Sequence, residues 1–237
     1  GRKVLCLTKD NEGDIWIGTF YNGLNLWMER EHNYLLIYEN PSDNSIKGRI
    51  VRSIYPDETG GVWIGTEDGG LNRFDISSRQ MQKYDILSTT NGKTDIQALV
   101  LDNGVLWIAT YDDGLYLMNA TTGKILKHYG FPCDRNASLL KTSDGEILVG
   151  TIHGLYSYDR KNDSFKYFEK VGPSFIHTLM QDSNGSVWAG TYGSGICYIN
   201  LHSGNVHKIT TRDSRYGLTS DFITSFYEDS SRRLWVT

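Results

Sequence analysis

The sequence predicts an all-β chain folded as a β-propeller. Two observations carry this prediction: a short phrase of the type Trp-Ile-Gly-Thr recurs, and each copy stands within the same series of strand-like runs and turns. The copies are Trp16–Thr19, Trp63–Thr66, Trp107–Thr110, Leu148–Thr151, Trp188–Thr191 and a shortened Trp235–Thr237. Their first residues lie 47, 44, 41, 40 and 47 positions apart, a period typical of propeller blades.

Each repeat contains four short runs that read as β-strands. In the second repeat, runs at 50–55, 63–66, 71–74 and 81–84 are separated by turns at 57–61 and 68–70. The third repeat has runs at 96–101, 105–110, 115–119 and 125–129, and the fifth has runs at 175–180, 187–191, 196–200 and 206–209. Because no stretch shows a 3.6-residue apolar period over helix length, helical solenoids are excluded.

The repeat boundaries predict five complete four-stranded blades and two strands of a sixth. The expected blades are 1–47, 48–92, 93–134, 135–172 and 173–218, followed by a partial blade at 219–237 with strands at 222–228 and 234–237. We expect a fragment of a larger, seven-bladed propeller. Since exposed sheet edges pair readily, a homodimer or association through open edges is expected.

The phrase itself fits a sheet that is buried on both faces. Side chains alternate along a strand, so Trp and Gly point to one face while Ile and Thr point to the other. We expect the Gly where a neighbouring blade approaches the backbone, with Ala109 as the exception.

Composition limits the classes of partner. The net charge of −4 and the scattered Lys and Arg give no basic stripe, so nucleic acid is not an expected partner. There is no run of 18 apolar residues, and direct membrane insertion of this chain is not expected. The three cysteines fall at unrelated repeat positions and the six histidines show no ligand spacing, so we expect no metal site and no cofactor.

Acidic turns recur between the first and second strands of the repeats. They are Asp10–Gly13, Asp102–Gly104, Asp144–Gly145 and Asp182–Gly185. A calcium loop would need further oxygen ligands at fixed spacing, so we interpret them as turns in which Asp caps the backbone and Gly or Asn adopts positive φ. No nucleophile motif or pair of carboxylates at glycosidase separation can be placed, so catalysis has no positive support.

The chain resembles a known family through its second repeat. Asp57–Gly60, Trp63–Thr66 and Gly69–Asp75 are similar to the two-component regulator propeller repeat, and the lead-in Asn40–Ile46 is similar to the usual connection between its blades. The resemblance covers essentially the whole chain. The fourth repeat departs most, with Leu148 in place of Trp and a single Gly154 before Leu155.

The resemblance implies a role that the period alone does not show. It implies a periplasmic sensor fragment from a Bacteroides-type hybrid histidine kinase/response regulator, which binds glycan-derived oligosaccharides and signals to a kinase without being an enzyme itself. Two alternatives remain open. One is a propeller carbohydrate-active enzyme, a lyase or glycosidase, and the other is a protein-interaction scaffold.

Antiparallel topology points to one face for ligand binding. The loop from strand two to strand three and the connection to the next blade fall at the same end, and connectors at 40–49, 87–94 and 211–220 join them there. The candidate ligand-binding residues on this face are Tyr21, Arg52, Asp68, Tyr111, Asp112, His153, His177 and Tyr192, and Gln97 is expected to edge the central channel beside Arg52 and His177. Aromatic rings stack on sugars while the polar groups bind hydroxyls.

Overall fold

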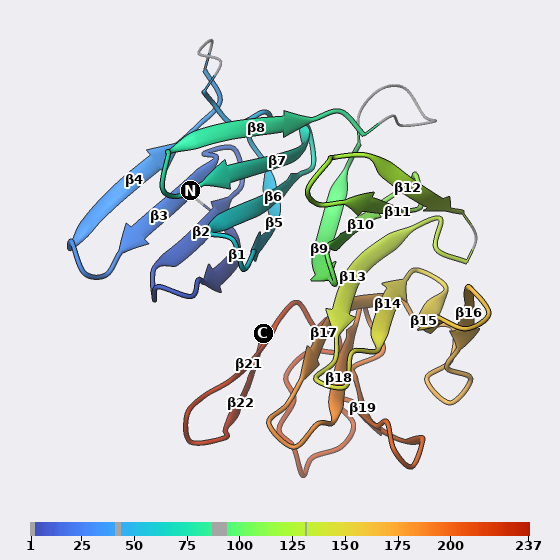
Figure 1. Cartoon of the computed structure of the whole chain (residues 1–237). Coiled ribbons are helices and arrows are strands. Elements are labelled where there is room, and N and C mark those ends of the chain that lie inside the picture. The colour runs from blue at the N-terminus through green and yellow to red at the C-terminus, as the bar shows by residue number, and fades with distance from the viewer. Residues whose placement is uncertain (1–2, 41–43, 87–93, 131) are drawn as a thin grey trace. The chain divides into compact units, whose positions relative to one another are not determined.

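The computed structural model describes residues 3–40, 44–86, 94–130 and 132–237 (Figure 1). Twenty-two strands and no helix occur in these ranges, so the all-β prediction is confirmed. The chain divides into two units, residues 1–130 and residues 131–237, which are described separately below.

The first unit contains three four-stranded antiparallel sheets, in each of which the strands follow chain order. The first sheet is β1 (Val4–Lys9), β2 (Ile15–Thr19), β3 (Leu24–Met28) and β4 (Asn33–Ile37). The second is β5 (Val51–Pro56), β6 (Gly61–Thr66), β7 (Gly70–Asp75) and β8 (Gln80–Tyr84). The third is β9 (Ile96–Asp102), β10 (Val105–Thr110), β11 (Leu115–Asn119) and β12 (Ile125–Tyr129).

The second unit contains two four-stranded sheets and a two-stranded one. The fourth sheet is β13 (Asn136–Lys141), β14 (Ile147–Thr151), β15 (Gly154–Asp159) and β16 (Ser164–Tyr167). The fifth is β17 (Ile176–Gln181), β18 (Val187–Thr191), β19 (Ile196–Asn200) and β20 (Asn205–Ile209), and the sixth is β21 (Phe226–Glu228) and β22 (Leu234–Val236).

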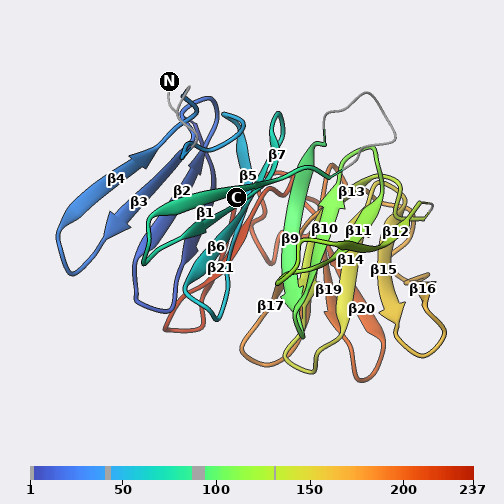
Figure 2. The same ribbon diagram turned by 45° about the horizontal axis from the view of Figure 1, so that its top comes forward.

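Within each unit the sheets stack as propeller blades do. The first strand of one sheet lies beside the first strand of the next: β1 beside β5 and β5 beside β9 in the first unit, and β13 beside β17 and β17 beside β21 in the second. Figure 2 shows the separate sheets of each unit from a second direction. The predicted propeller architecture of four-stranded blades is therefore confirmed.

The recurring indoles fill the spaces between sheets, as the phrase predicts. Trp16 is fully buried and packs edge-on against Phe74 of the second sheet, with ring centroids 5.8 Å apart. Trp63 lies in a core with Ile96 and Ile108 of the third sheet. Trp235, by contrast, is 55% exposed.

The glycine of the phrase lies where the next sheet touches the backbone. A Cβ on Gly65 would overlap Ser53 Oγ and lie 2.5 Å from Ile96 Cγ2. Gly18 meets Val51 and Gly190 meets Ile223 in the same way. The expectation of a close approach is confirmed at these positions.

The threonine of the phrase closes the hairpin that follows it. Thr66 Oγ1 donates to Gly70 O at 2.9 Å and accepts from Gly69 N at 3.1 Å. Thr110 makes the corresponding bonds to Gly114 O and from Asp113 N, and Thr191 does so with Gly195 O and Ser194 N. A small hydroxyl side chain is thus needed at this buried position.

The acidic turns are capped as predicted in some repeats but not in all. Asp10 Oδ1 accepts from the N–H groups of Glu12 and Asp14, and Asp182 Oδ1 accepts from those of Asn184 and Ser186. In the fourth repeat the prediction for Asp144 is wrong, because Thr142 Oγ1 accepts the N–H of Glu146 instead.

Asp102 also differs from the expected cap. It ends β9, and the turn that follows is made by Asn103 and Gly104 with φ of 49° and 77°. Two consecutive positive φ values form a tight hairpin turn that needs no side-chain cap.

The strand expected at 222–228 is shorter, because Phe222 makes only an isolated bridge with Tyr192 and β21 begins at Phe226. Residues 41–43 and 87–93 of the expected connectors lie outside the described ranges.

The three cysteines are free thiols, and burial raises the pKa of Cys6 and Cys133 to about 12.

Candidate functional site

A β-bulge occurs at the start of the first strand in each four-stranded sheet. In the second sheet Val51 pairs with Thr66 and Ser53 pairs with Gly65, which leaves Arg52 as the extra residue. The bulge residues of the five sheets are Leu5, Arg52, Gln97, Ala137 and His177. Bulges interrupt the alternation of side chains and often re-aim one at a functional site.

Each bulge lies beside the residue that follows the phrase threonine. The backbone N–H of that residue donates to the residue just before the first strand, as Glu67 does to Ile50, Tyr111 to Asp95 and Tyr192 to Phe175. These bonds place the loop from strand two to strand three at the same end as the incoming connector. We call the two side chains a rim pair: Leu5/Phe20, Arg52/Glu67, Gln97/Tyr111, Ala137/Ile152 and His177/Tyr192.

The rim pairs of the second and third sheets form a polar cluster. Arg52 Nε donates to Glu67 Oε2 at 2.7 Å, and both side chains are about one-third exposed. Gln97 Nε2 donates to Asp95 Oδ1 at 2.5 Å. Tyr111 is 42% exposed.

Asp95 links these groups electrostatically. Burial is the main cause that raises its pKa to about 6, and the negative charges of Glu67 and Asp112 add to the effect, while Gln97 and Arg52 oppose it. A half-buried carboxyl that takes up a proton near neutral pH can donate as well as accept hydrogen bonds. Sequence reasoning missed Asp95, although its place directly before the bulge strand was a usable signal.

The Asp68 carboxylate and the Tyr21 ring both contact the segment that leads into β5. Asp68 Oδ1 accepts the backbone N–H groups of Arg49 and Ile50 at 2.9 and 3.1 Å, so this carboxylate holds the start of β5. Tyr21 adopts φ of 68° and its ring lies 5.6 Å from the guanidinium carbon of Arg49.

Asp112 is exposed in the loop after Thr110.

In the second unit, the rim pair His177/Tyr192 belongs to an aromatic cluster. The Tyr192 ring lies 4.8 Å from Phe222, 5.8 Å from Phe175 and 6.3 Å from His177, measured between centroids. Tyr192 is 58% exposed and Phe222 is 52% exposed. Sequence reasoning placed Phe222 inside a strand and did not single out Phe175 for this face.

His153 is held by a carboxylate. Its Nε2 lies 3.1 Å from Asp134 Oδ1, and both side chains are partly exposed. It follows Ile152, whose N–H donates to Arg135 O. His153 thus stands beside the rim pair of the fourth sheet.

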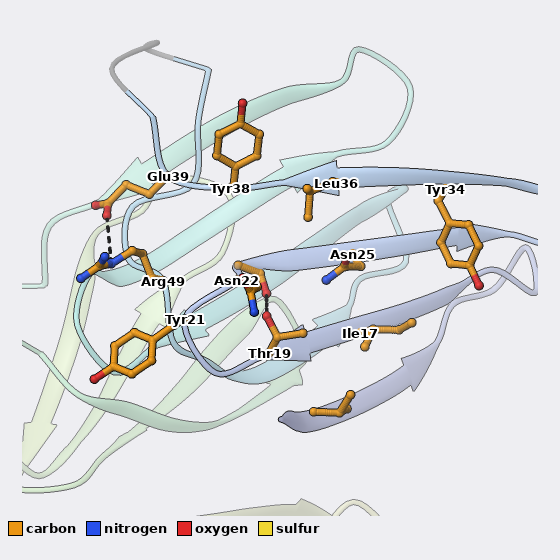
Figure 3. Close-up of a pocket in the computed structure, with 12 residues that line it drawn as sticks. Ile17, Thr19, Tyr21, Asn22, Asn25, Tyr34, Leu36, Tyr38, Glu39 and Arg49 are labelled. Atoms are coloured by element: carbon orange, nitrogen blue, oxygen red, sulfur yellow. Dashed lines mark hydrogen bonds and ion pairs between the residues drawn. The ribbon is translucent and has the colours of Figure 1, made fainter. Parts of the chain in front are cut away.

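A hollow of about 510 Å³ opens on the first sheet, on the face that carries Ile17 and Thr19 (Figure 3). It is lined by Val4, Ile17, Thr19, Tyr21, Asn22, Gly23, Asn25, Tyr34, Leu36, Tyr38, Glu39 and Arg49. Figure 3 shows the Asn25 side chain between Ile17 and Leu36. Of the predicted site residues, only Tyr21 lines this hollow.

Metal and membrane features are not found in the described ranges. No three His, Cys, Asp or Glu side chains there are grouped so that they could hold a metal ion. The same residues include no helix that could cross a membrane.

The fold and the repeating rim pairs define a β-propeller built from one recurring blade. Residues 1–21, 45–68 and 170–193 match the family described as two component regulator propeller. This match confirms the resemblance to the two-component regulator propeller repeat that the sequence predicts.

Two known proteins of two-component signalling are similar to this chain. A histidine kinase named P4 from Formosa agariphila is 24% identical over 216 residues, which is 90% of this chain and 13% of that protein. The extracellular domain of a hybrid two component system from B. thetaiotaomicron is similar with a TM-score of 0.86 and 22% identity, over 99% of this chain and 32% of that one. The chain thus spans about a third of that domain.

A propeller enzyme shares the fold as well. The structure of a virginiamycin B lyase from Staphylococcus aureus is similar with a TM-score of 0.77 and 14% identity, over all of this chain and 78% of that one. At such identity the likeness concerns the fold alone.

Proposed function

We propose that this chain is part of an extracytoplasmic sensor that binds an oligosaccharide at its rim and signals to a histidine kinase, without catalysing a reaction. The family and the likeness to an extracellular domain of a hybrid two component system support the sensor role. Under this proposal the ligand biases a kinase equilibrium through its different affinity for two arrangements of the sensor.

The observation that carries the sugar proposal is the exposed aromatic cluster of the second unit. Tyr192 and Phe222 are each more than half exposed and their rings are adjacent, so together they form a contiguous exposed apolar patch of the kind that marks ligand-binding surfaces. Apolar sugar faces stack on such rings, and His177 beside them supplies a polar group for hydroxyls.

The polar cluster of the first unit supports the same chemistry. Arg52, Glu67, Asp95 and Gln97 offer both donors and acceptors, and Tyr111 adds an exposed ring. A site with convergent polar groups beside an aromatic ring suits a neutral or weakly acidic oligosaccharide.

Calorimetry with a panel of oligosaccharides from dietary and host glycans tests the proposal. The variant Tyr192→Ala/Phe222→Ala should lower the affinity for a binding oligosaccharide at least about tenfold, because each lost stacking contact costs on the order of 1 kcal/mol. Tyr227→Ala is the matched control, since Tyr227 is 65% exposed and its ring makes no aromatic contact among the described residues.

The second test combines Arg52→Ala, Tyr111→Ala and Tyr192→Ala. We expect weaker binding with a nearly unchanged melting temperature, because all three side chains are at least partly exposed. Unchanged binding would show that none of these three side chains contacts the ligand. Release of shortened or unsaturated sugars from the panel would instead favour a lyase or glycosidase.

A further inference from the structure

A cleft of about 440 Å³ lies between the second and third sheets of the first unit. One wall includes Trp63, Arg73, Gln82 and Tyr84 of the second sheet, and the other includes Leu101 and Ala120 of the third. The turn between β5 and β6 borders the cleft, so it lies at the end of the blades opposite to the rim pairs. Its volume falls within the range of about 300–1,000 Å³ that is usual for small-molecule sites.

The second-sheet wall of this cleft is polar where the equivalent wall of the first sheet is apolar. By strand register, Arg73 stands where the first sheet has Leu26, Gln82 where it has Leu35, and Tyr84 where it has Ile37. These three residues of the first sheet belong to, or pack against, the apolar core between the first and second sheets. Three apolar positions of one interface are thus occupied by hydrogen-bonding side chains in the next.

The third-sheet wall is also changed. Ala120 is equivalent to Ile76 of the second sheet, since the N–H of Ala120 donates to Gly104 O as that of Ile76 donates to Gly60 O. Ile76 packs against the core of the first interface. The hollow there is smaller, about 290 Å³, and Trp16 does not line it, whereas the cleft beside Ala120 reaches Trp63.

The second-sheet wall carries hydrogen-bond donors that lack acceptors. Trp63 is 1% exposed, and its indole Nε1 has no partner in the described part of the chain. Arg73 donates from Nε to Asp57 and from Nη2 to Thr59, but its Nη1 lies 4.0 Å from Asp75 Oδ2, beyond hydrogen-bonding distance. A ligand that brings an acceptor to this wall therefore meets donors that the protein itself leaves unpaired.

Gln82 adds a donor at the mouth of the cleft. Its Oε1 accepts from the Tyr84 hydroxyl at 2.9 Å, and its Nε2 makes no hydrogen bond within the described ranges. The side chain is exposed, so this amide group is accessible to a ligand. Both Gln82 and Arg73 can thus donate to the same incoming acceptor.

The charges around these donors favour an acceptor without charge. Asp57 and Asp75 both lie beside the Arg73 guanidinium, and the Glu58 carboxylate is exposed at the mouth. Three carboxylates around one guanidinium repel an anion. An amide carbonyl supplies the acceptor without that repulsion, and a methyl group next to it suits the apolar wall of Leu101 and Ala120.

We propose that this cleft binds an N-acetylated sugar, whose acetamido carbonyl accepts from Arg73 Nη1 and Gln82 Nε2 while its methyl group lies against Ala120. The sugar hydroxyls meet the Glu58 carboxylate and the Thr121 hydroxyl, which are exposed and make no side-chain hydrogen bond among the described residues. The site is separate from the rim, so it goes beyond the proposed function and does not depend on the ligand that the rim binds.

An NMR titration of the full chain with N-acetylglucosamine tests the proposal. We expect saturable shifts of the Gln82 side-chain amide and the Trp63 indole N–H, with a dissociation constant on the order of 1 mM for a monosaccharide. Glucose, which lacks the acetamido group, should bind about tenfold more weakly, because the carbonyl acceptor is lost. A glycine with acetyl and methylamide ends carries the same carbonyl and methyl group without the ring, and it should also bind more weakly.

Two variants that place first-sheet residues in the cleft supply an independent measurement. Gln82→Leu should lower the affinity for N-acetylglucosamine about tenfold, and Ala120→Ile should abolish binding because it fills the cleft. Both variants should fold, since Leu and Ile occupy the equivalent positions at the first interface. Gln80→Leu is the matched control, because Gln80 is exposed on the same strand and does not line the cleft.

Four results would overturn the proposal. They are the absence of saturable shifts, equal affinity for glucose, binding that survives Ala120→Ile, and shifts confined to Tyr192 and Phe222, which would assign the sugar to the rim. Tighter binding of the blocked glycine than of N-acetylglucosamine would assign the cleft to a peptide, and would overturn the sugar assignment as well.

Discussion

Arg73 donates a hydrogen bond to one carboxylate oxygen of Asp57. In other repeats the equivalent oxygen accepts the N–H of an indole. Arg73 Nε donates to Asp57 Oδ2 at 2.9 Å. The corresponding oxygens of Asp10, Asp182 and Asp229 accept from the indole N–H groups of their own phrases, at 2.7, 2.9 and 3.0 Å. The buried Trp63 Nε1 has no partner among the described residues, and Arg73 lies over the Trp63 ring at 5.7 Å.

The first prediction is that Arg73→Leu restores the indole bond. The first sheet carries Leu26 opposite Trp16, as the second carries Arg73 opposite Trp63. With the guanidinium removed, Asp57 Oδ2 becomes available, and a buried donor without a partner costs about 1–3 kcal/mol. We expect slower hydrogen exchange and a downfield shift of the Trp63 indole proton by NMR. An unchanged indole signal would contradict this.

The second prediction concerns pH and Asp95. Because burial raises the pKa of Asp95 to about 6, the folded state binds more protons than the unfolded state between pH 4 and 6. The free energy of unfolding therefore falls as pH rises through this range, and the loss persists above it. Asp95→Asn removes this dependence, so the variant should gain stability relative to the wild type between pH 4.5 and 7 in urea unfolding. Asp144→Asn, at an exposed turn position, is the control; an equal gain there would exclude Asp95 as the source.

The third prediction tests the close approach between sheets. Gly65→Ala should lower the free energy of unfolding by about 1–3 kcal/mol, because the added methyl group meets Ser53 and Ile96. Gly130→Ala should be nearly neutral, since a Cβ at Gly130 meets nothing within 4 Å and its φ is not in the left-handed region. Similar losses for both variants in chemical denaturation would argue against the contact.

The fourth prediction concerns the indole core. Trp63→Ala should cost roughly 3–5 kcal/mol, because a fully buried ring is removed from the core with Ile96 and Ile108. Trp235→Ala should cost less than about 1 kcal/mol, since its ring is 55% exposed. Far-UV circular dichroism is the appropriate probe, as both changes alter tryptophan fluorescence.

The fold could be predicted from the sequence because the phrase encodes its own packing. Alternation puts Trp16 and Gly18 on one face, and the structure places both against the second sheet. The residue that caps the turn at Asp144 could not be predicted in the same way. Asp and Thr both accept backbone N–H groups, and Thr142, two positions earlier, takes this role.

The candidate site was only partly accessible from sequence. Arg52, Gln97 and His177 could be placed at the strand starts, but the bulge that sets them apart depends on register between strands. Asp95 escaped notice because its raised pKa comes mainly from burial, which depends on the packing of the strands, and to a lesser extent from Glu67, which is distant in sequence. Phe222, whose exposed ring lies beside Tyr192, was missed because the sequence pattern placed it inside an expected strand.

The bonds of Thr66, Thr110 and Thr191 to their own hairpins mean that each rim loop is closed by its own blade. A single loop can therefore change in sequence while the neighbouring loops keep their geometry. Residues 67–69 and 111–113 are thus separate positions at which ligand preference can diverge, or be redesigned, one blade at a time, whereas residues 192–194 are also bonded to Asp221.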